Sequence, residues 1–247
     1  MDKKYTLITG ASSGIGAATA ILLGRERNLI LNGRDRERLA AVGSACAGHD
    51  RNILLFHYDL ENAENLSTAL TTFLLEHKAG VEAFVHCAGM TEVLPIGKTK
   101  YHIGLRVMNV NYFSATEIIS TLLKRKVNAD TLKKIILVTS IAASVGAPHQ
   151  PHYCASKGAL EALRITLARD LAPRVQVNAI APGSFRTRMW STPLADTPSE
   201  EDWKPPTLLP PGTVEEVAHV AHFLLSEAAG YLTGVLLPVN GGEHLHK

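Results

Sequence analysis

The chain has 247 residues, of which 46% are hydrophobic and 19% charged, and its formal net charge is +2. This composition excludes wholesale disorder, and the near-neutral charge excludes a general attraction to nucleic acid or anionic lipid. The three cysteines are too few for a disulfide framework, and the sequence contains no run of about 18 apolar residues that predicts a membrane span. We therefore expect a soluble, cytoplasmic, globular protein with neither nucleic acid nor membrane as a partner.

Short apolar runs rich in β-branched residues alternate along the chain with amphipathic segments. The predicted strands cover residues 5–9, 28–32, 52–58, 83–87, 134–140, 174–181 and 235–239. The predicted helices cover residues 14–27, 35–46, 63–78, 101–126, 153–172 and 213–226. This alternation is typical of a parallel sheet covered on both faces. The predicted fold class is α/β, a doubly wound (Rossmann-type) sheet of about seven parallel strands with helices on both faces.

One segment departs from this alternation, because residues 182–212 contain seven of the 12 prolines. Proline interrupts helices and sheet ladders, and a loop of this length in a compact domain is usually functional or disordered. We interpret residues 183–212 as a lid within a single domain that spans residues 1–247. Three large side chains of the lid are candidates to line a substrate pocket, to pack the lid down or to form an oligomer contact: Met189, Trp190 and Trp203.

A glycine-rich turn follows the first predicted strand. Residues 9–16 read Thr-Gly-Ala-Ser-Ser-Gly-Ile-Gly and lead directly into a predicted helix. Glycine permits a tight turn and a close approach of the backbone to a ligand, and a helix N-terminus offers free N–H groups to an anion. A nucleotide diphosphate fits such a turn, although the spacing differs from the common Gly-x-Gly-x-x-Gly fingerprint. The alternative is a strand-to-helix turn that binds no ligand.

Tyr153 and Lys157 lie four residues apart at the start of a predicted helix and therefore share one of its faces. A free tyrosine has a pKa near 10, so ionisation near neutral pH requires stabilisation of the phenolate by about 4 kcal/mol. A lysine cation at about 4 Å supplies roughly this energy at an effective dielectric near 20. Ser140 ends the fifth predicted strand, at the sheet edge where ligands of parallel sheets bind. The Tyr–Lys pair alone is equally typical of a protein surface.

Together these motifs resemble those of the short-chain dehydrogenase/reductase family, in order and over essentially the whole chain. The motifs that carry the resemblance are residues 9–16, Asn111, Ser140, and residues 153–157, 178–183 and 240–242. The resemblance implies hydride transfer between nicotinamide and a carbonyl or alcohol. It implies that Tyr153 exchanges the proton, that Lys157 lowers the pKa of Tyr153 and holds the nicotinamide ribose, and that Ser140 hydrogen-bonds the reacting oxygen. Asn111 would kink its helix and bind a water that relays protons to Lys157.

The resemblance also implies a set of cofactor contacts. The candidate cofactor-binding residues are Gly10, Ser12, Ser13, Gly14, Ile15, Gly16, Arg34, Asp59, Leu60, Ala88, Gly89, Tyr153, Lys157, Pro182, Gly183, Phe185 and Thr187. Where the family often has Asn-Asn-Ala-Gly after the fourth strand, this chain begins the motif with His86 and Cys87. This departure puts the usual hydrogen bonds to neighbouring strands in doubt, but not the chemistry. We interpret Cys87 as a buried cysteine at a strand end.

The end of the second predicted strand bears on the choice of cofactor. Gly33 takes the place where NAD-preferring members tend to carry an aspartate, and the following Arg34 suits a 2′-phosphate. The sequence therefore favours NADP. NAD is the alternative, because Asp35 also suits a ribose contact and Ser13 is not the basic residue of many NADP-preferring relatives. Asp59 resembles the family's adenine contact, with a helix cap as its alternative role.

The sequence thus predicts an NADP-dependent oxidoreductase, a ketone or 3-oxoacyl-type reductase with a small-molecule carbonyl or alcohol substrate. The alternatives are a non-catalytic nucleotide-binding regulatory or scaffold protein, and an isomerase or dehydratase that uses the cofactor transiently. We expect no metal site, because Pro148 and Pro151 interrupt the metal-like spacing of His149 and His152. His149, His152 and Val145 precede Tyr153 and are candidates to face the substrate.

Two surface features bear on partners. The basic run over residues 124–126 is interpreted as a solvated helix end, with the docking of an acidic carrier protein as the alternative. By resemblance, the predicted helices over residues 101–126 and 153–172 pair with their own copies, in a homodimer or homotetramer.

Overall fold

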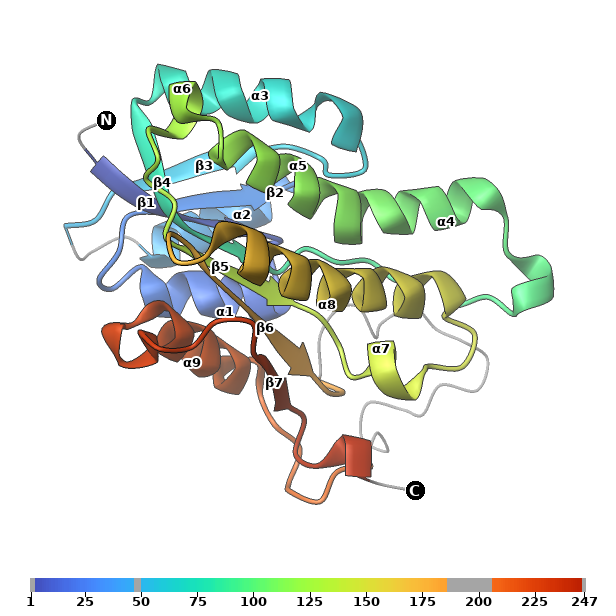
Figure 1. Ribbon diagram of the computed structural model, residues 1–247. Helices are drawn as coiled ribbons and strands as arrows, with labels where there is room; N and C mark the ends of the chain where they lie inside the picture. Colours follow the sequence, from blue (N-terminus) through green and yellow to red (C-terminus); the bar gives the residue numbers. More distant parts are fainter. Residues whose placement is uncertain (1–2, 47–49, 186–205, 246–247) are drawn as a thin grey trace.

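The computed structural model describes residues 3–46, 50–185 and 206–245. Seven parallel strands form one sheet in the order β3-β2-β1-β4-β5-β6-β7, as Figure 1 shows. The strands are β1 (Lys3–Thr9), β2 (Leu29–Gly33), β3 (Ile53–His57), β4 (Ala79–His86), β5 (Lys134–Val138), β6 (Gln176–Pro182) and β7 (Leu236–Val239). The predicted α/β class with about seven parallel strands is confirmed.

Helices cover both faces of this sheet (Figure 1). One face carries α1 (Gly14–Leu23), α2 (Arg36–Cys46) and α9 (Val214–Leu225). The other face carries α3 (Ala63–Glu76), α4 (Tyr101–Met108), α5 (Ser114–Leu122) and α8 (Pro151–Leu171). Short helical turns occupy the connections: η1 (Ile96–Lys98), α6 (Arg125–Asn128), α7 (Ala142–Val145), η4 (Glu227–Ala229) and η5 (Glu243–Leu245). None of the helices described in residues 3–46, 50–185 and 206–245 combines the length and apolar character needed to cross a bilayer.

The two-sided core follows from the alternation of side chains along each strand. Leu7 packs beneath α3, α5 and α8, whereas the next residue, Ile8, packs beneath α1, α2 and α9. Both are fully buried, and Phe84 and Val85 repeat the arrangement in β4. Burial of one such side chain contributes roughly 1.5–3 kcal/mol. The strands read as nearly continuous apolar runs because neither of their faces meets water.

The strand order changes direction between β1 and β4, and this reversal places the site. The chain runs from β1 to β2 and β3 on one side, then crosses back to lay β4 against the other side of β1. Thr9, the last residue of β1, lies in register with His86, the last residue of β4. Ligands of open parallel sheets bind at such a reversal, beyond the carboxyl ends of the strands.

The helix predicted over residues 101–126 is not continuous in the structure. It ends at Met108, and Asn109–Phe113 form one turn of π-helix (η2) before α5 begins. A π turn inserts one extra residue into a helix, and here it buries Asn111. Pro151 begins α8, so His152 lies within this helix and His149 lies outside it. The missing N–H group of Pro151 has no partner in the first turn of any helix.

Most of the predicted lid lies outside the described residues, because the description omits residues 186–205, and with them Thr187, Met189, Trp190 and Trp203. The chain that returns from this segment packs against the turn after β7. The backbone N–H groups of Leu208 and Leu209 donate to the carbonyl of Gly241 at 2.8 and 3.1 Å.

Candidate active site

A cleft of about 440 Å³ opens at the carboxyl ends of the strands. It is lined by these sequence-predicted residues: Gly10, Ser12, Ser13, Gly14, Ile15, Gly16, Arg34, Asp59, Leu60, Ala88, Gly89, Ser140, Tyr153, Lys157, Pro182, Gly183 and Phe185. It is also lined by residues that the sequence analysis did not select: Asn32, Gly33, Arg38, Tyr58, Cys87, Met90, Thr91, Val110, Val138 and Thr139. Most of these lie beside a selected residue in the chain, so proximity to a motif was the available signal. Asn111 is buried behind the wall of the cleft.

The glycine turn forms one wall of the cleft through close backbone contacts. Gly10 has a φ of +64°, and a Cβ at this position would lie 2.8 Å from the Ala88 Cα. A Cβ at Gly16 would lie 2.3 Å from the Gly10 carbonyl oxygen, so α1 packs onto the turn only without a side chain there. Ser13 precedes α1 without forming a side-chain cap. The first N–H groups of α1 therefore face the cleft mouth as donors for an anion.

Tyr153, Lys157 and Ser140 converge at the other end of the cleft. The four-residue spacing in α8 turns Tyr153 and Lys157 toward the end of β5, and the Lys157 Nζ lies 5.8 Å from the centroid of the Tyr153 ring. The same Nζ donates to the Val138 carbonyl at 2.8 Å. Ser140 follows β5, is 8% exposed and hydrogen-bonds the Tyr153 phenol through its side chain. An acid, an ammonium group and a hydroxyl thus meet in one place.

Burial is the main cause of the pKa shifts of Tyr153 and Lys157. It raises the pKa of the Tyr153 phenol, and the hydrogen bond with Ser140 only partly opposes that rise. Burial also lowers the pKa of the Lys157 ammonium to about 8, and the hydrogen-bond partner of this ammonium is the uncharged Val138 carbonyl. The predicted lowering of the Tyr153 pKa by Lys157 is therefore not found in this geometry. A phenol that stays protonated near neutral pH is suited to donate a proton.

Asn111 connects the π turn to two other segments of the site. Its amide nitrogen donates to the Met90 carbonyl at 3.0 Å and to the Ser156 hydroxyl at 2.8 Å, while its amide oxygen accepts the Met90 N–H at 2.8 Å. Ser156 in turn donates to the carbonyl of Tyr153 at 2.7 Å. The helix kink implied for Asn111 is the η2 turn itself. Asn111 therefore ties the helix that carries Tyr153 to the floor of the cleft.

Two guanidinium groups line the opposite end, where β2 ends. Arg34 has a side chain that is 65% exposed, and its Nη1 lies 3.3 Å from Glu61 Oε1. Arg38 also lines the cleft, and Asp35 accepts its backbone N–H at 3.0 Å and its Nε–H at 2.6 Å. These hydrogen bonds lower the pKa of the Asp35 carboxyl. Asp35, just before α2, is thus occupied by Arg38 of that helix and does not line the cleft.

Glu61 is a feature that sequence reasoning missed. Its carboxylate accepts hydrogen bonds from Arg106 of α4 at 2.9 and 3.0 Å, in addition to the contact with Arg34. These two arginines hold the pKa of Glu61 below its usual range. The neighbouring Asp59 accepts the Glu61 N–H at 3.0 Å, so its side chain stabilises this turn and does not cap α3.

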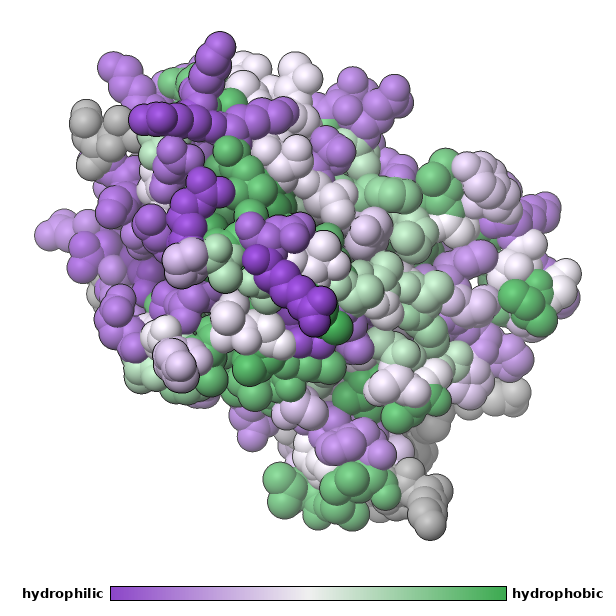
Figure 2. Space-filling model, viewed as in Figure 1, coloured by the Kyte–Doolittle hydropathy of each residue, from purple (hydrophilic) through white to green (hydrophobic). Residues whose placement is uncertain are grey.

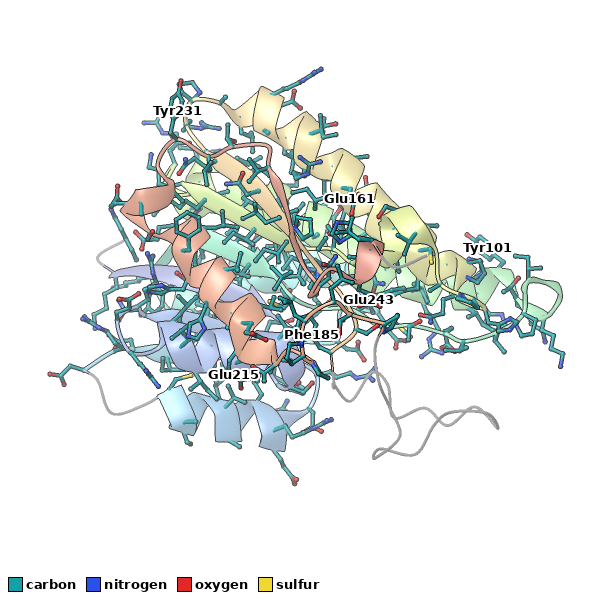
Figure 3. The ribbon with its side chains drawn as sticks, turned by 90° about the horizontal axis from the view of Figure 1, so that it is seen from below. Tyr101, Glu161, Phe185, Glu215, Tyr231 and Glu243 are labelled. Atoms are coloured by element: carbon teal, nitrogen blue, oxygen red, sulfur yellow. The ribbon has the colours of Figure 1, made fainter. Side chains whose placement is uncertain are left out.

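Glu243 of η5 is the second residue that sequence reasoning missed. Its side chain lies beside the chain that leaves β6. Its carboxylate accepts the Ser184 backbone N–H at 2.6 Å and the Ser184 hydroxyl at 2.7 Å. A Cβ at Gly183 would lie 2.4 Å from Glu243 Oε2, so only glycine allows this contact. Figure 3 shows Glu243 close to Phe185, which lines the cleft. Glu243 therefore holds the segment that leads into the predicted lid.

The segment before α8 contacts the segment after β4 and not the cleft. The Leu94 N–H donates to the His149 carbonyl at 2.7 Å. The His152 ring packs against α4, where a Cβ at Gly104 would lie 2.9 Å from its Cε1. In the part of the chain that the structure describes, the cleft lining includes neither of these histidines nor Val145. Their position facing the substrate stays a prediction.

This arrangement fits a nicotinamide dinucleotide. At the start of α1 the glycine turn leaves no room for a Cβ at Gly10 or Gly16. The cleft has the guanidinium groups of Arg34 and Arg38 at one end. The Tyr153 phenol, the Lys157 ammonium and the Ser140 hydroxyl lie at the other end. The backbone of residues 10–16 would hold the diphosphate, and Lys157 would hold the hydroxyls of the nicotinamide ribose.

Comparison with known proteins gives relatives along the whole chain. The model of a family described as enoyl-(acyl carrier protein) reductase matches residues 10–244. Protein FixR of Bradyrhizobium diazoefficiens is 36% identical over 258 residues, which cover 99% of this chain and 88% of the relative. The 3-oxoacyl-[acyl-carrier-protein] reductase FabG of Rickettsia prowazekii is 33% identical, over 97% of this chain and 96% of the relative.

Solved structures agree with these relatives. A short-chain type dehydrogenase/reductase from Mycobacterium ulcerans superposes with a TM-score of 0.85 at 28% identity, over 100% of this chain and 91% of the other. A dehydrogenase/reductase from Sinorhizobium meliloti 1021 gives 0.84 at 29% identity, over 97% and 94%. The fold, the order of the motifs and the relatives lead to one conclusion: the chain belongs to the short-chain dehydrogenase/reductase family and is an NAD(P)-dependent oxidoreductase.

Proposed function

We propose that this protein is an NADP-dependent reductase that converts the carbonyl of a ketone or 3-oxoacyl-type substrate to an alcohol. The observation that carries the proposal is the convergence of Tyr153, Lys157 and Ser140 at one end of a cleft that presents Arg34 and Arg38 at its other end. The substrate class is supported by the FabG relatives, which are named as 3-oxoacyl-[acyl-carrier-protein] reductases.

The reduced nicotinamide, when bound, supplies the hydride. The Tyr153 phenol, protonated because burial raises its pKa, gives its proton to the carbonyl oxygen of the substrate. The Ser140 hydroxyl accepts the Ala142 N–H at 3.1 Å and hydrogen-bonds the Tyr153 phenol, and with substrate bound its hydrogen would be donated to the same oxygen. This donor stabilises the negative charge that develops on the oxygen. Lys157 holds the ribose and adds positive charge beside the phenol.

The choice of NADP rests on the charges at the end of β2. Arg34 and Arg38 both line the cleft, while Asp35 is engaged by Arg38 and does not line it. A guanidinium group binds a 2′-phosphate through a planar pair of donors, whereas a 2′-hydroxyl is usually bound by a free carboxylate. In the described part of the cleft, Arg34 also has the exposure that such a contact requires.

The variant Tyr153→Phe tests the chemistry. It removes the proton donor and keeps the ring, so turnover should fall by about 10²–10⁴-fold while the dissociation constant for NADPH stays within about twofold. A screen of carbonyl substrates, followed through the absorbance of reduced nicotinamide, measures the first quantity, and fluorescence titration measures the second. Wild-type turnover in this variant would refute the role of Tyr153. Tight NADPH binding by the wild type without turnover of any carbonyl would indicate a non-catalytic binding protein.

The variant Arg34→Ala tests the cofactor. The loss of one charged contact to the 2′-phosphate should weaken NADPH binding by about 10–150-fold and leave NADH binding nearly unchanged. Arg36→Ala is the matched control, because Arg36 begins α2 in the same short segment but does not line the cleft. Equal losses for the two cofactors would overturn the choice of NADP.

The subunit arrangement stays a prediction, and the surface supports pairing through α4, α5 and α8. Tyr101, Leu105 and Phe113 are 83%, 39% and 40% exposed along α4 and η2, and Ile165 of α8 is 46% exposed. On the face seen in Figure 2, neutral and weakly hydrophobic residues cover much of the region of α8, and hydrophilic residues predominate toward the N-terminus. Light scattering on the purified protein would distinguish a dimer or tetramer from a monomer.

A further inference from the structure

His86, the last residue of β4, is a buried titratable group that the proposed reaction does not use. Its side chain is fully buried between the end of β1 and the η2 turn. The ring makes two hydrogen bonds, from Nδ1 to Thr9 Oγ1 at 2.9 Å and from Nε2 to the Asn111 carbonyl oxygen at 3.0 Å. It occupies the position where many members of the family carry asparagine, so this chain has its own means of joining these segments.

The partners of the ring determine where its proton lies. A carbonyl oxygen only accepts, so Nε2 carries the hydrogen and donates it to Asn111. In the neutral ring Nδ1 is then an acceptor, and the Thr9 hydroxyl donates to it. The Thr9 oxygen itself accepts the Ala88 N–H at 3.2 Å. The result is one directed chain of hydrogen bonds from Ala88 through Thr9 and His86 to Asn111.

The surroundings keep this ring neutral. Burial, and to a smaller extent the positive charge of Lys157 on α8, lower the pKa of His86 to about 3, while the hydrogen bond to Asn111 opposes them. The other titratable neighbour is Cys87, whose thiol pKa burial raises to about 12, so it carries no charge that would favour a protonated ring. The Phe84 ring, with its centroid 5.9 Å from that of His86, is apolar.

Both ends of the hydrogen-bond chain reach the proposed site. At one end, the Ala88 backbone supports the glycine turn, because Gly10 packs directly against it. At the other end, Asn111 holds Met90 and, through Ser156, the turn of α8 that carries Tyr153. His86 is therefore the link between the cofactor cradle and the helix that bears the acid.

We propose that His86 is a positioning residue whose Nε2–H group holds the Asn111 carbonyl and thereby sets the placement of Met90 and of the Tyr153 turn. A carbonyl oxygen has two acceptor positions, and His86 fills one of them on Asn111. The kinetic part of this inference rests on the proposed reductase activity, whereas its structural part does not.

The tautomer is tested first, by NMR of the ring nitrogens in protein labelled with ¹⁵N-histidine and free of cofactor. We expect the Nε2–H tautomer, with no titration between about pH 5 and 8. A ring that titrates in this range, or one that carries its hydrogen on Nδ1, would overturn the inference.

Two variants then separate positioning from packing. In His86→Gln the amide nitrogen reaches about as far as ring Nε2 and keeps the donor to Asn111, whereas in His86→Asn the amide reaches only about as far as Nδ1. We expect kcat to stay within about threefold in the glutamine variant and to fall about 10-fold or more in the asparagine variant, because small misplacements of reacting groups reduce rates strongly. The dissociation constant for NADPH should be unchanged within about twofold in both. The exposed His219, changed to glutamine, is the control.

A second readout needs no activity. Asn111 Oδ1 accepts the Met90 N–H, so hydrogen exchange at Met90 should be about 10-fold faster in the asparagine variant than in the glutamine variant. Equal kcat and equal exchange in the two variants, with a merely lowered melting temperature, would show that His86 only fills space and would refute the proposal. If the wild type reduces no carbonyl, the proposed function fails, and the exchange and NMR measurements still decide the role of His86.

Discussion

The buried neutral histidine makes a quantitative prediction about stability and pH. His86 has a pKa near 6.5 in the unfolded chain and about 3 in the folded protein, because burial excludes the charged ring. Between these values the unfolded state binds more protons, so the His86 contribution to the free energy of unfolding is lost as pH falls below 6.5. At roughly 1.4 kcal/mol per pH unit, the loss should reach about 1 kcal/mol at pH 5.5 and about 3 kcal/mol at pH 4.5.

Urea unfolding of the wild type and of His86→Gln measures this loss. Both proteins are unfolded at one protein concentration at about pH 7.5, 5.5 and 4.5, and the difference in their free energies of unfolding is followed against pH. Subtraction removes the contributions of the carboxylates and of the other histidines, which both proteins share. The stability of the wild type relative to the variant should fall by about 3 kcal/mol between pH 7.5 and 4.5. Parallel profiles for the two proteins would refute the argument that His86 is held neutral.

Two further predictions concern Lys157 and Asn128. Reductive turnover at saturating NADPH should fall as pH rises through about 8, because the buried Lys157 ammonium loses its charge there. Stopped-flow rates across this range provide the check, and a flat profile would argue against a charged Lys157 in catalysis. Asn128→Ala should lower the free energy of unfolding by about 1–3 kcal/mol, since this fully buried side chain hydrogen-bonds Val81 N, Val81 O and Leu122 O at 2.7, 3.0 and 3.2 Å. The shift of the urea midpoint measures it, and an unchanged midpoint would contradict it.

The sequence predicted features that arise from neighbouring residues, and it did not predict features that arise from contacts between residues far apart in the chain. The α/β alternation is local, because a run of β-branched apolar residues and an amphipathic helix are each visible within a short window. The four-residue spacing of Tyr153 and Lys157 is likewise local, and it places both side chains on one face of α8. The apolar pattern continues through Asn109–Phe113 and does not reveal the π turn, whereas the family resemblance implied a kink at Asn111, which this turn provides.

The residues that hold the site in place depend on partners far away in the chain. Glu243 contacts Ser184 across 59 positions, Glu61 contacts Arg106 across 45, and His86 contacts Thr9 across 77. Asp35 shows the same choice among partners at short range, since its distance from the glycine turn also suited a ribose contact, whereas its side chain binds Arg38, three residues away. Which of several possible partners a side chain binds is decided by how the helices and strands pack against one another.

The sequence by itself determined the class of fold, the glycine turn after β1 and the pairing of Tyr153 with Lys157. Each of these follows from backbone conformation and side-chain periodicity within about a dozen residues. Only the tertiary structure decided that Lys157 donates to Val138, that burial raises the pKa of Tyr153, and that His86 joins Thr9 to Asn111. Burial and long-range hydrogen bonds arise when the crossovers bring β1, β4 and β5 together, and no local pattern specifies which side chains then meet.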